Sequence, residues 1–129
     1  MYKSKHLLES EIEAKLVKGV KALGGMALKW VSPGKNGVPD RIVFLPGGRV
    51  IFVELKADDG NLRPTQRVMQ KKLKDLGVDV RVVKGVNEVD WFISGCAEII
   101  ERDREVTELR DYIVNEIFVP RSYGKDGAE

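Results

Sequence analysis

Three charged residues stand at the ends of two stretches of this sequence that otherwise have the composition of buried β-strands. Asp40 follows Gly-Val-Pro (37–39), while Glu54 and Lys56 end the run Phe-Val-Glu-Leu-Lys (52–56). Burying a lone charge costs several kcal/mol, so two acids and an amine beside a core are usually needed for chemistry. Two carboxylates can hold a divalent metal ion, and a lysine can contact the phosphate or water beside it. The spacing therefore predicts metal-assisted chemistry at a phosphate.

The two strands that carry these residues are predicted to pair as a hairpin. Residues 41–45 and 49–56 are joined by Pro-Gly-Gly (46–48), a composition typical of a hairpin turn. If these three residues form the loop, counting outward sets Asp40 opposite Glu54. Directly opposed residues have Cβ atoms about 5 Å apart, close enough for two carboxylates to share one metal ion. A bulge in the turn would shift the register by one residue, so both registers stay open.

The remaining pattern predicts an α/β domain with the order α-β-β-β-α-β, followed by further helices. Helices are expected at about 6–23, 64–76 and, more briefly, 87–93, and strands at 26–31 and 78–83. A further helix over 98–118 is interpreted as an addition to the compact domain, packed on it or used for association. We therefore expect one domain over 1–95 and a helical extension with a loose polar tail over 96–129.

Composition narrows the possible chemistry. The chain has 129 residues, 43% hydrophobic and 33% charged, as expected for a globular domain. A single cysteine, Cys96, excludes an intramolecular disulfide and a cysteine-cluster zinc site, and a single histidine, His6, argues against His-based metal sites and Ser-His catalysis. No apolar run reaches the length of a membrane span and no signal-peptide core follows the N-terminus, so a cytoplasmic location without a membrane partner is expected.

Charge is distributed unevenly along the chain. Residues 1–85 contain 17 Lys and Arg against 9 Asp and Glu, whereas residues 86–129 contain 5 against 11. A basic domain with an acidic tail points to a polyanionic partner such as nucleic acid, although a charged surface is also simply well solvated. The cations expected to contact a DNA backbone flank the proposed metal site or line the second helix: Lys29, Lys35, Arg41, Arg63, Arg67, Lys71 and Lys72.

The longer sequence context resembles a known family. Asp40 and Glu54-x-Lys56 on adjacent strands resemble the PD-(D/E)xK nuclease superfamily. Together with Leu-Gly-Gly (23–25), Lys-Trp-Val-Ser-Pro-Gly (29–34) and Gly-Val-Pro-Asp-Arg-Ile-Val (37–43), they are similar to the VRR-NUC family. That family contains small stand-alone virus and prophage proteins and supplies the nuclease domain of the Fanconi-associated nuclease. The resemblance covers about residues 7–93.

The resemblance implies a fold and an activity. The fold would be a restriction-endonuclease-like αβββαβ core, with a mixed central sheet flanked by helices and here an extra C-terminal helix. The activity would be cleavage of DNA phosphodiester bonds with Mg²⁺ or Mn²⁺. The small stand-alone members resemble Holliday-junction-resolving enzymes, so branched DNA and a homodimer are expected.

The resemblance also implies roles for individual residues. Asp40, Glu54 and the backbone carbonyl of Leu55 match the metal ligands, and Lys56 matches the catalytic lysine. Gln66 matches the glutamine of the helix after the Glu-x-Lys strand. A glutamate on the first helix is also usual, and Glu13 fits that place best, with Glu9 one turn earlier as the second choice.

Each role has a simpler alternative. Asp40 could be a turn acid, Glu54 and Lys56 a surface ion pair, Gln66 a satisfied interior amide, and Glu13 a solvated helix residue. We predict a metal-dependent, structure-selective DNA endonuclease. The alternative is a non-cleaving DNA-binding module that recruits a helicase or another replication or repair partner; the intact acids and lysine weigh against it.

Overall fold

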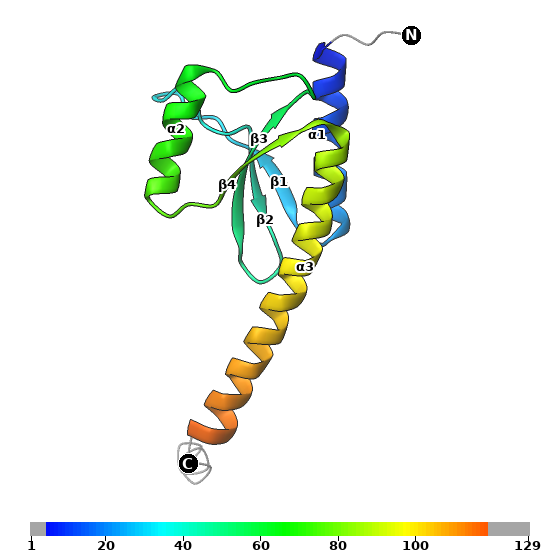
Figure 1. Cartoon of the computed structure of the whole chain (residues 1–129). Helices are drawn as coiled ribbons and strands as arrows, with labels where there is room; N and C mark the ends of the chain where they lie inside the picture. Colours follow the sequence, from blue (N-terminus) through cyan, green and yellow to red (C-terminus); the bar gives the residue numbers. More distant parts are fainter. Residues whose placement is uncertain (1–4, 119–129) are drawn as a thin grey trace.

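The computed structural model describes residues 5–118 and the side chains of residues 9–118. In chain order the elements are helix α1 (Lys5–Ala22), strands β1 (Met26–Lys29), β2 (Arg41–Phe44) and β3 (Val50–Lys56), helix α2 (Pro64–Asp75), strand β4 (Val80–Lys84), helix α3 (Gly85–Tyr112) and a π-helical segment, η1 (Ile113–Phe118). The sheet lies between α1 and α3 on one side and α2 on the other (Figure 1). The mixed α/β fold with flanking helices is thus confirmed. The predicted loose tail and the side chain of His6 lie outside the described residues.

The four strands form one mixed sheet in the order β1-β2-β3-β4. The pairs β1–β2 and β2–β3 are antiparallel, and β4 runs parallel to β3. β3 is therefore a central strand, as its two apolar faces predicted, because only a strand covered on both sides needs apolar residues at successive positions.

The core lies between the sheet and the helices α1 and α3. Ile51, Val53 and Leu55 of β3 are buried on this face. They join a cluster that includes three residues of α1 and three of α3: Ile12, Leu16, Val20, Val89, Phe92 and Cys96. The period of two along β3 leaves Glu54 and Lys56 on the opposite face, on the side of α2.

The hairpin between β2 and β3 has the predicted register. Phe44 pairs with Val50 and Arg41 with Val53, and the backbone amide of Leu45 donates to the carbonyl of Arg49 over 2.9 Å. Continuing this ladder by one residue sets Asp40 opposite Glu54. The three-residue loop is possible because Gly47 and Gly48 adopt positive φ angles of 93° and 89°, a region that side-chain-bearing residues rarely enter.

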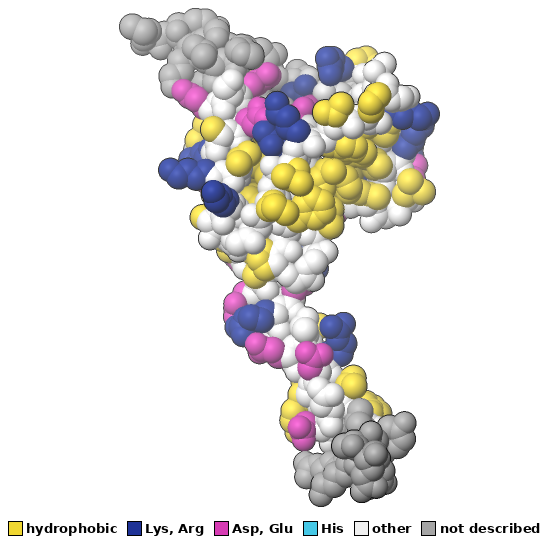
Figure 2. Space-filling model, turned by 180° about the vertical axis from the view of Figure 1, so that it is seen from behind, with side chains coloured by type: hydrophobic (Ala, Val, Ile, Leu, Met, Phe, Trp, Pro, Cys, Tyr) yellow, Lys and Arg dark blue, Asp and Glu magenta, His cyan; other side chains and the backbone are white. Residues whose placement is uncertain are grey.

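The face of the sheet beside α2 is covered only in part. The uncovered apolar face comprises Met26, Leu28, Phe44 and Val50, which are all exposed. Seen from behind, hydrophobic side chains gather on this side of the molecule (Figure 2). Next to it the rings of Trp30 and Phe52 contact each other at a tilt of 50°, with centroids 4.9 Å apart.

Helix α3 corrects one prediction. The sequence predicts two separate helices, at 87–93 and 98–118; instead one helix runs without a break over 28 residues and passes through Ser94 and Gly95, which lower helix propensity. Buried Cys96 and partly buried Ile99 and Ile100 pack on the core just after this weak point. Such packing outweighs a local cost of about 1 kcal/mol for a glycine. The predicted division at residue 95 therefore falls inside a helix, whose second half projects from the body (Figure 1).

The length and composition of the helices decide whether any of them could span a membrane. Within residues 5–118, none combines the length and the apolar composition needed to cross a bilayer.

Candidate functional site

Asp40 and Glu54 meet where β2 begins and β3 ends, as the register requires. Pro39 is buried, and the backbone carbonyl of Asp40 accepts a hydrogen bond from the amide of Trp30, so the chain leading into β2 is fixed. The Asp40 carboxylate accepts a 2.9 Å hydrogen bond from the amide of Leu55. This contact ties the loop before β2 to the end of β3.

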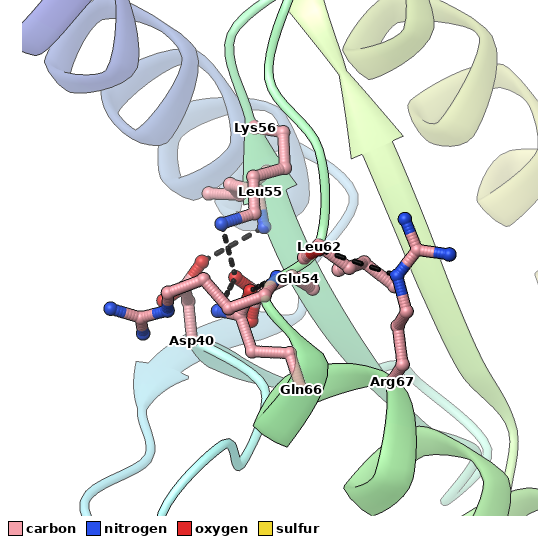
Figure 3. Close-up of polar contacts among 8 residues, drawn as sticks. Asp40, Glu54, Leu55, Lys56, Leu62, Gln66 and Arg67 are labelled. Atoms are coloured by element: carbon pink, nitrogen blue, oxygen red, sulfur yellow. Dashed lines mark hydrogen bonds and ion pairs between the residues drawn. The ribbon is translucent and has the colours of Figure 1, made fainter.

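Glu54 lies at the centre of the site, with Asp40, Lys56 and Gln66 around it (Figure 3). Its side chain is only 2% exposed. One carboxylate oxygen, Oε2, accepts a 2.7 Å hydrogen bond from Gln66 Nε2 and lies 3.5 Å from Lys56 Nζ. The other oxygen, Oε1, is buried and has no hydrogen-bond partner among the described residues. A buried acceptor left unpaired is costly, so an unpaired carboxylate oxygen marks a place suited to a ligand.

Burial also changes the acidity of Glu54. Desolvation and, after it, the nearby charge of Asp40 raise the pKa of this carboxyl to about 7 against the opposing effect of Lys56. Two acids held this close in a partly dry site cannot both ionise easily without a cation between them. A perturbed carboxyl in a cleft is typical of functional sites.

Gln66 is fixed from both ends of its amide. Its Oε1 accepts a 2.8 Å hydrogen bond from the backbone amide of Arg63, just before α2, and its Nε2 donates to Glu54. The first contact is half of a capping box, in which a Glu or Gln in the first turn bonds back to the N-cap residue. The inward position of Gln66 was predicted, but the cap was missed because Arg63 is not a typical N-cap residue.

Two clefts adjoin the pair of acids. One, of about 350 Å³, is lined by Glu9, Asp40, Glu54, Leu55, Lys56, Asn61, Arg63 and Gln66. The other, of about 300 Å³, is lined by Glu9, Glu13, Lys29, Trp30, Val38, Asp40 and Leu55. Glu9 lines both clefts, whereas Glu13 lines only the one without Glu54.

Glu13 and Arg41 are engaged with each other. The Arg41 guanidinium forms an ion pair with the Glu13 carboxylate and also donates a 2.9 Å hydrogen bond to the carbonyl of Ala27. The Arg41 side chain is largely buried, at 13% exposure. The structure therefore pairs Glu13 with Arg41 and turns Arg41 toward α1 and β1, while Glu13 still shares a cleft with Asp40. Their predicted roles, in metal binding and in DNA contact, stay predictions.

The other predicted DNA-contacting cations line separate hollows of the surface. Arg63 lines the cleft at Glu54 and Lys29 the neighbouring one. Lys35 and Lys72 border a third cavity, and Arg67 and Lys71 a fourth. The set is thus spread around α2 and the acids rather than gathered at one point.

The donor set suits a hard cation if the backbone contributes to it. Among residues 5–118, no three His, Cys, Asp or Glu side chains are gathered as a metal site. Asp40 and Glu54 offer carboxylate oxygens, one of them unpaired, and the backbone carbonyl of Leu55 directly follows Glu54 in the chain. Mg²⁺ commonly binds through one or two carboxylates with the remaining positions filled by water and substrate phosphate, so the residues fit that group of ions.

Comparison with known proteins defines the class of this domain. The family model of the VRR-NUC domain matches residues 3–87. A solved structure of a VRR-NUC domain, 31% identical, matches with a TM-score of 0.63 over 67% of this chain and 94% of that one. "Putative nuclease p44" of Acyrthosiphon pisum secondary endosymbiont phage 1 is 48% identical over 75 residues, which are 58% of this chain and 81% of that protein.

The chain belongs to the VRR-NUC family and carries its nuclease domain. The family resemblance predicted from the sequence is confirmed. Residues 88–118, which form most of α3 and all of η1, lie beyond the family match.

Proposed function

We propose that this protein is a metal-dependent DNA endonuclease that hydrolyses phosphodiester bonds with Mg²⁺ or Mn²⁺. The observation that carries the proposal is the state of Glu54, a carboxylate 2% exposed, close to a second acid and with one oxygen unpaired. A carboxyl pair without a catalytic use would not be expected to keep this arrangement, because a buried acid without full pairing destabilises the fold.

Asp40, Glu54 and the Leu55 carbonyl would hold the cation. When bound, a divalent cation neutralises phosphate charge and lowers the pKa of water. Glu9, which lines both clefts beside Asp40, is as well placed as Glu13 to complete the set through water. Glu13 would first have to leave Arg41.

Lys56 and Gln66 would act on the substrate side of the acids. Lys56 Nζ lies 3.5 Å from Glu54 and its side chain is 14% exposed, so it can reach a phosphate oxygen or a water in the cleft. An ammonium held there stabilises the charge that develops on the phosphate. Gln66 holds the Glu54 carboxylate in place, and such positioning contacts commonly affect activity strongly.

The DNA backbone would run along the basic side of the clefts. Lys29 and Arg63 line them directly, and Lys35, Arg67, Lys71 and Lys72 lie on or opposite α2. Such contacts fix position without reading sequence, so cutting is expected to follow DNA structure rather than base sequence, and we propose branched DNA as the substrate. We further propose a homodimer, whose candidate surfaces include the uncovered apolar face of the sheet.

The test is incubation with duplex, flap and four-way-junction DNA, with Mg²⁺, Mn²⁺, or EDTA. Metal-dependent cutting, favouring branched DNA, is expected. Glu54→Ala and Lys56→Ala should abolish it, whereas Asp59→Ala, which removes an exposed carboxylate just after β3, should not.

Two results would overturn the proposal. Binding to DNA with no nicking under any metal would favour the non-cleaving module that recruits a partner. Full cutting by Glu54→Ala would show that the acids identified here are not the active site. Light scattering of the purified protein decides between monomer and dimer.

A further inference from the structure

A groove beside α2 shares no residue with the two clefts at the acids, although its Arg67 and Lys71 are among the cations proposed above to contact the DNA backbone. Six residues line it around a space of about 400 Å³: Leu62, Arg67, Gln70, Lys71, Lys74 and Asp75. We infer that this α2 groove binds a phosphate of the DNA strand close to the one that is cut, with Gln70 and Lys74 as its principal contacts. The inference rests on the proposed function for the nature of the ligand, a nucleic-acid phosphodiester.

Gln70 is the feature that points to a ligand. Its side chain lies in the interior at 5% exposure, yet its Nε2 has no hydrogen-bond partner among the described residues. Only Arg41 Nε and Glu54 Oε1 share this state in the described part of the chain, and Glu54 belongs to the proposed active site. A buried amide donor without a partner is rare in native proteins and commonly indicates an unfilled contact. Because Gln70 also lines the groove, a rotation about its terminal torsion can turn the amide toward an anion.

The charge in the α2 groove favours an anion. Lys71 forms a 2.9 Å ion pair with Asp75, so the one acid of the groove is offset by a neighbouring cation. Arg67 donates from Nε to the carbonyl of Leu62 at 3.4 Å, a contact that uses only one of its donors (Figure 3). Arg67 and Lys74 therefore leave the groove positive, and a guanidinium with an ammonium is a common phosphate-binding pair.

The position of the groove fits a DNA strand that passes Glu54. Gln66, which holds Glu54, precedes Gln70 by one helical turn. A helix rises 1.5 Å per residue, so the two residues are about 6 Å apart along its axis. Because each strand of a duplex presents a phosphate about every 3.4 Å along its axis, the groove would hold a phosphate one or two positions from the scissile one. An anchor there would set which bond enters the site.

The direct test is the response of the Gln70 side-chain amide to inorganic phosphate. In ¹⁵N-labelled protein without divalent cations, its NH₂ signals should shift and saturate as phosphate is added. Lys74→Gln should weaken this response at least fivefold, whereas Lys21→Gln, the same charge change on exposed α1, should leave it as in the parent. Signals that do not move, or that move equally in Lys74→Gln, would overturn the inference.

A second variant tests the same groove with DNA. Gln70→Leu keeps a similar volume and removes the unpaired donor, so the melting temperature should hold or rise, while duplex DNA in the presence of Ca²⁺ should bind 3- to 10-fold more weakly. Unchanged DNA affinity would contradict the inference. Cleavage by the parent chain is scored separately: if it cuts no DNA but the Gln70 amide responds to phosphate, only the catalytic proposal fails.

Discussion

Gln66 Nε2 donates a 2.7 Å hydrogen bond to Glu54 Oε2, and this bond joins the first turn of α2 to the end of β3. The amide is oriented by its second contact, with the backbone of Arg63. The start of α2 therefore sets the position of the most buried acid in the domain.

Gln66→Ala should reduce cleavage while it leaves the fold intact. Without the hydrogen bond from Gln66, the ionised form of Glu54 is less stable and less well oriented for a cation. The concentration of Mn²⁺ needed for half-maximal cutting should therefore rise about 10- to 100-fold. Metal titrations of cleavage check this. Thr65→Ala, an exposed neighbour on α2, is the matched control. Equal Mn²⁺ requirements in the parent and in Gln66→Ala would show that this hydrogen bond does not affect metal binding by Glu54.

The metal-free protein should lose stability as the pH rises through neutrality. The pKa of Glu54 is raised from 4.5 to about 7 in the folded chain, so the folded state binds more protons than the unfolded state between these values. The contribution of the Glu54 carboxyl to the free energy of unfolding is fully present below about pH 4.5. It is lost as the pH rises through 7, which lowers the free energy of unfolding by roughly 3 kcal/mol.

Urea unfolding in EDTA between pH 5 and 8.5 measures this loss. Glu54→Gln should flatten the profile and be more stable than the parent at pH 8, whereas exposed Asp59→Asn should keep the parental slope. A parental profile in Glu54→Gln would assign the pH dependence to other groups.

The site acids could be predicted because both constraints on them are local. The Pro-Gly-Gly turn sets the register of the hairpin, and the register sets Asp40 opposite Glu54. The apolar residues on both faces of β3 identified it as central, which made Glu54 a buried acid. These features depend on neighbours within about 15 positions.

Features that depend on packing between distant segments could not be predicted in the same way. Spacing on α1 does not distinguish Glu9 from Glu13, since both follow the helical period; the choice depends on where Arg41 points across the sheet. Likewise, Ser94 and Gly95 suggest a helix end, and only the packing of Cys96 and Ile99 on the core keeps α3 continuous. Gln70 was not predicted as a site residue, although it follows Gln66 by one helical turn on the same face of α2.

Arg41 should act on stability more than on DNA contact. Its guanidinium links Glu13 of α1 to the carbonyl of Ala27 in β1 and is largely buried. Arg41→Ala removes a partly buried donor from both acceptors, so the free energy of unfolding should fall by about 1–3 kcal/mol. Urea unfolding measures the loss.

The salt dependence of DNA binding separates the two roles of Arg41. A residue that contacts phosphate lowers the slope of log K against log salt by about one when it is removed. Arg41→Ala should leave this slope unchanged, and Arg63→Ala, at the cleft beside Glu54, should reduce it. A reduced slope in Arg41→Ala would instead support the prediction that Arg41 contacts DNA.

The first half of α3 should be part of the nuclease fold, although the family match ends at residue 87. A chain that ends at residue 95 loses buried Cys96 and the partly buried Ile99 and Ile100, whereas one that ends at residue 104 keeps them and the Arg49–Asp103 ion pair. Because each lost aliphatic contact exposes core surface, the shorter chain should be less stable by about 2–4 kcal/mol, and the longer one close to the full chain. Thermal unfolding of the three chains measures this. Equal melting temperatures for the chains ending at 95 and 104 would support a domain boundary at residue 95.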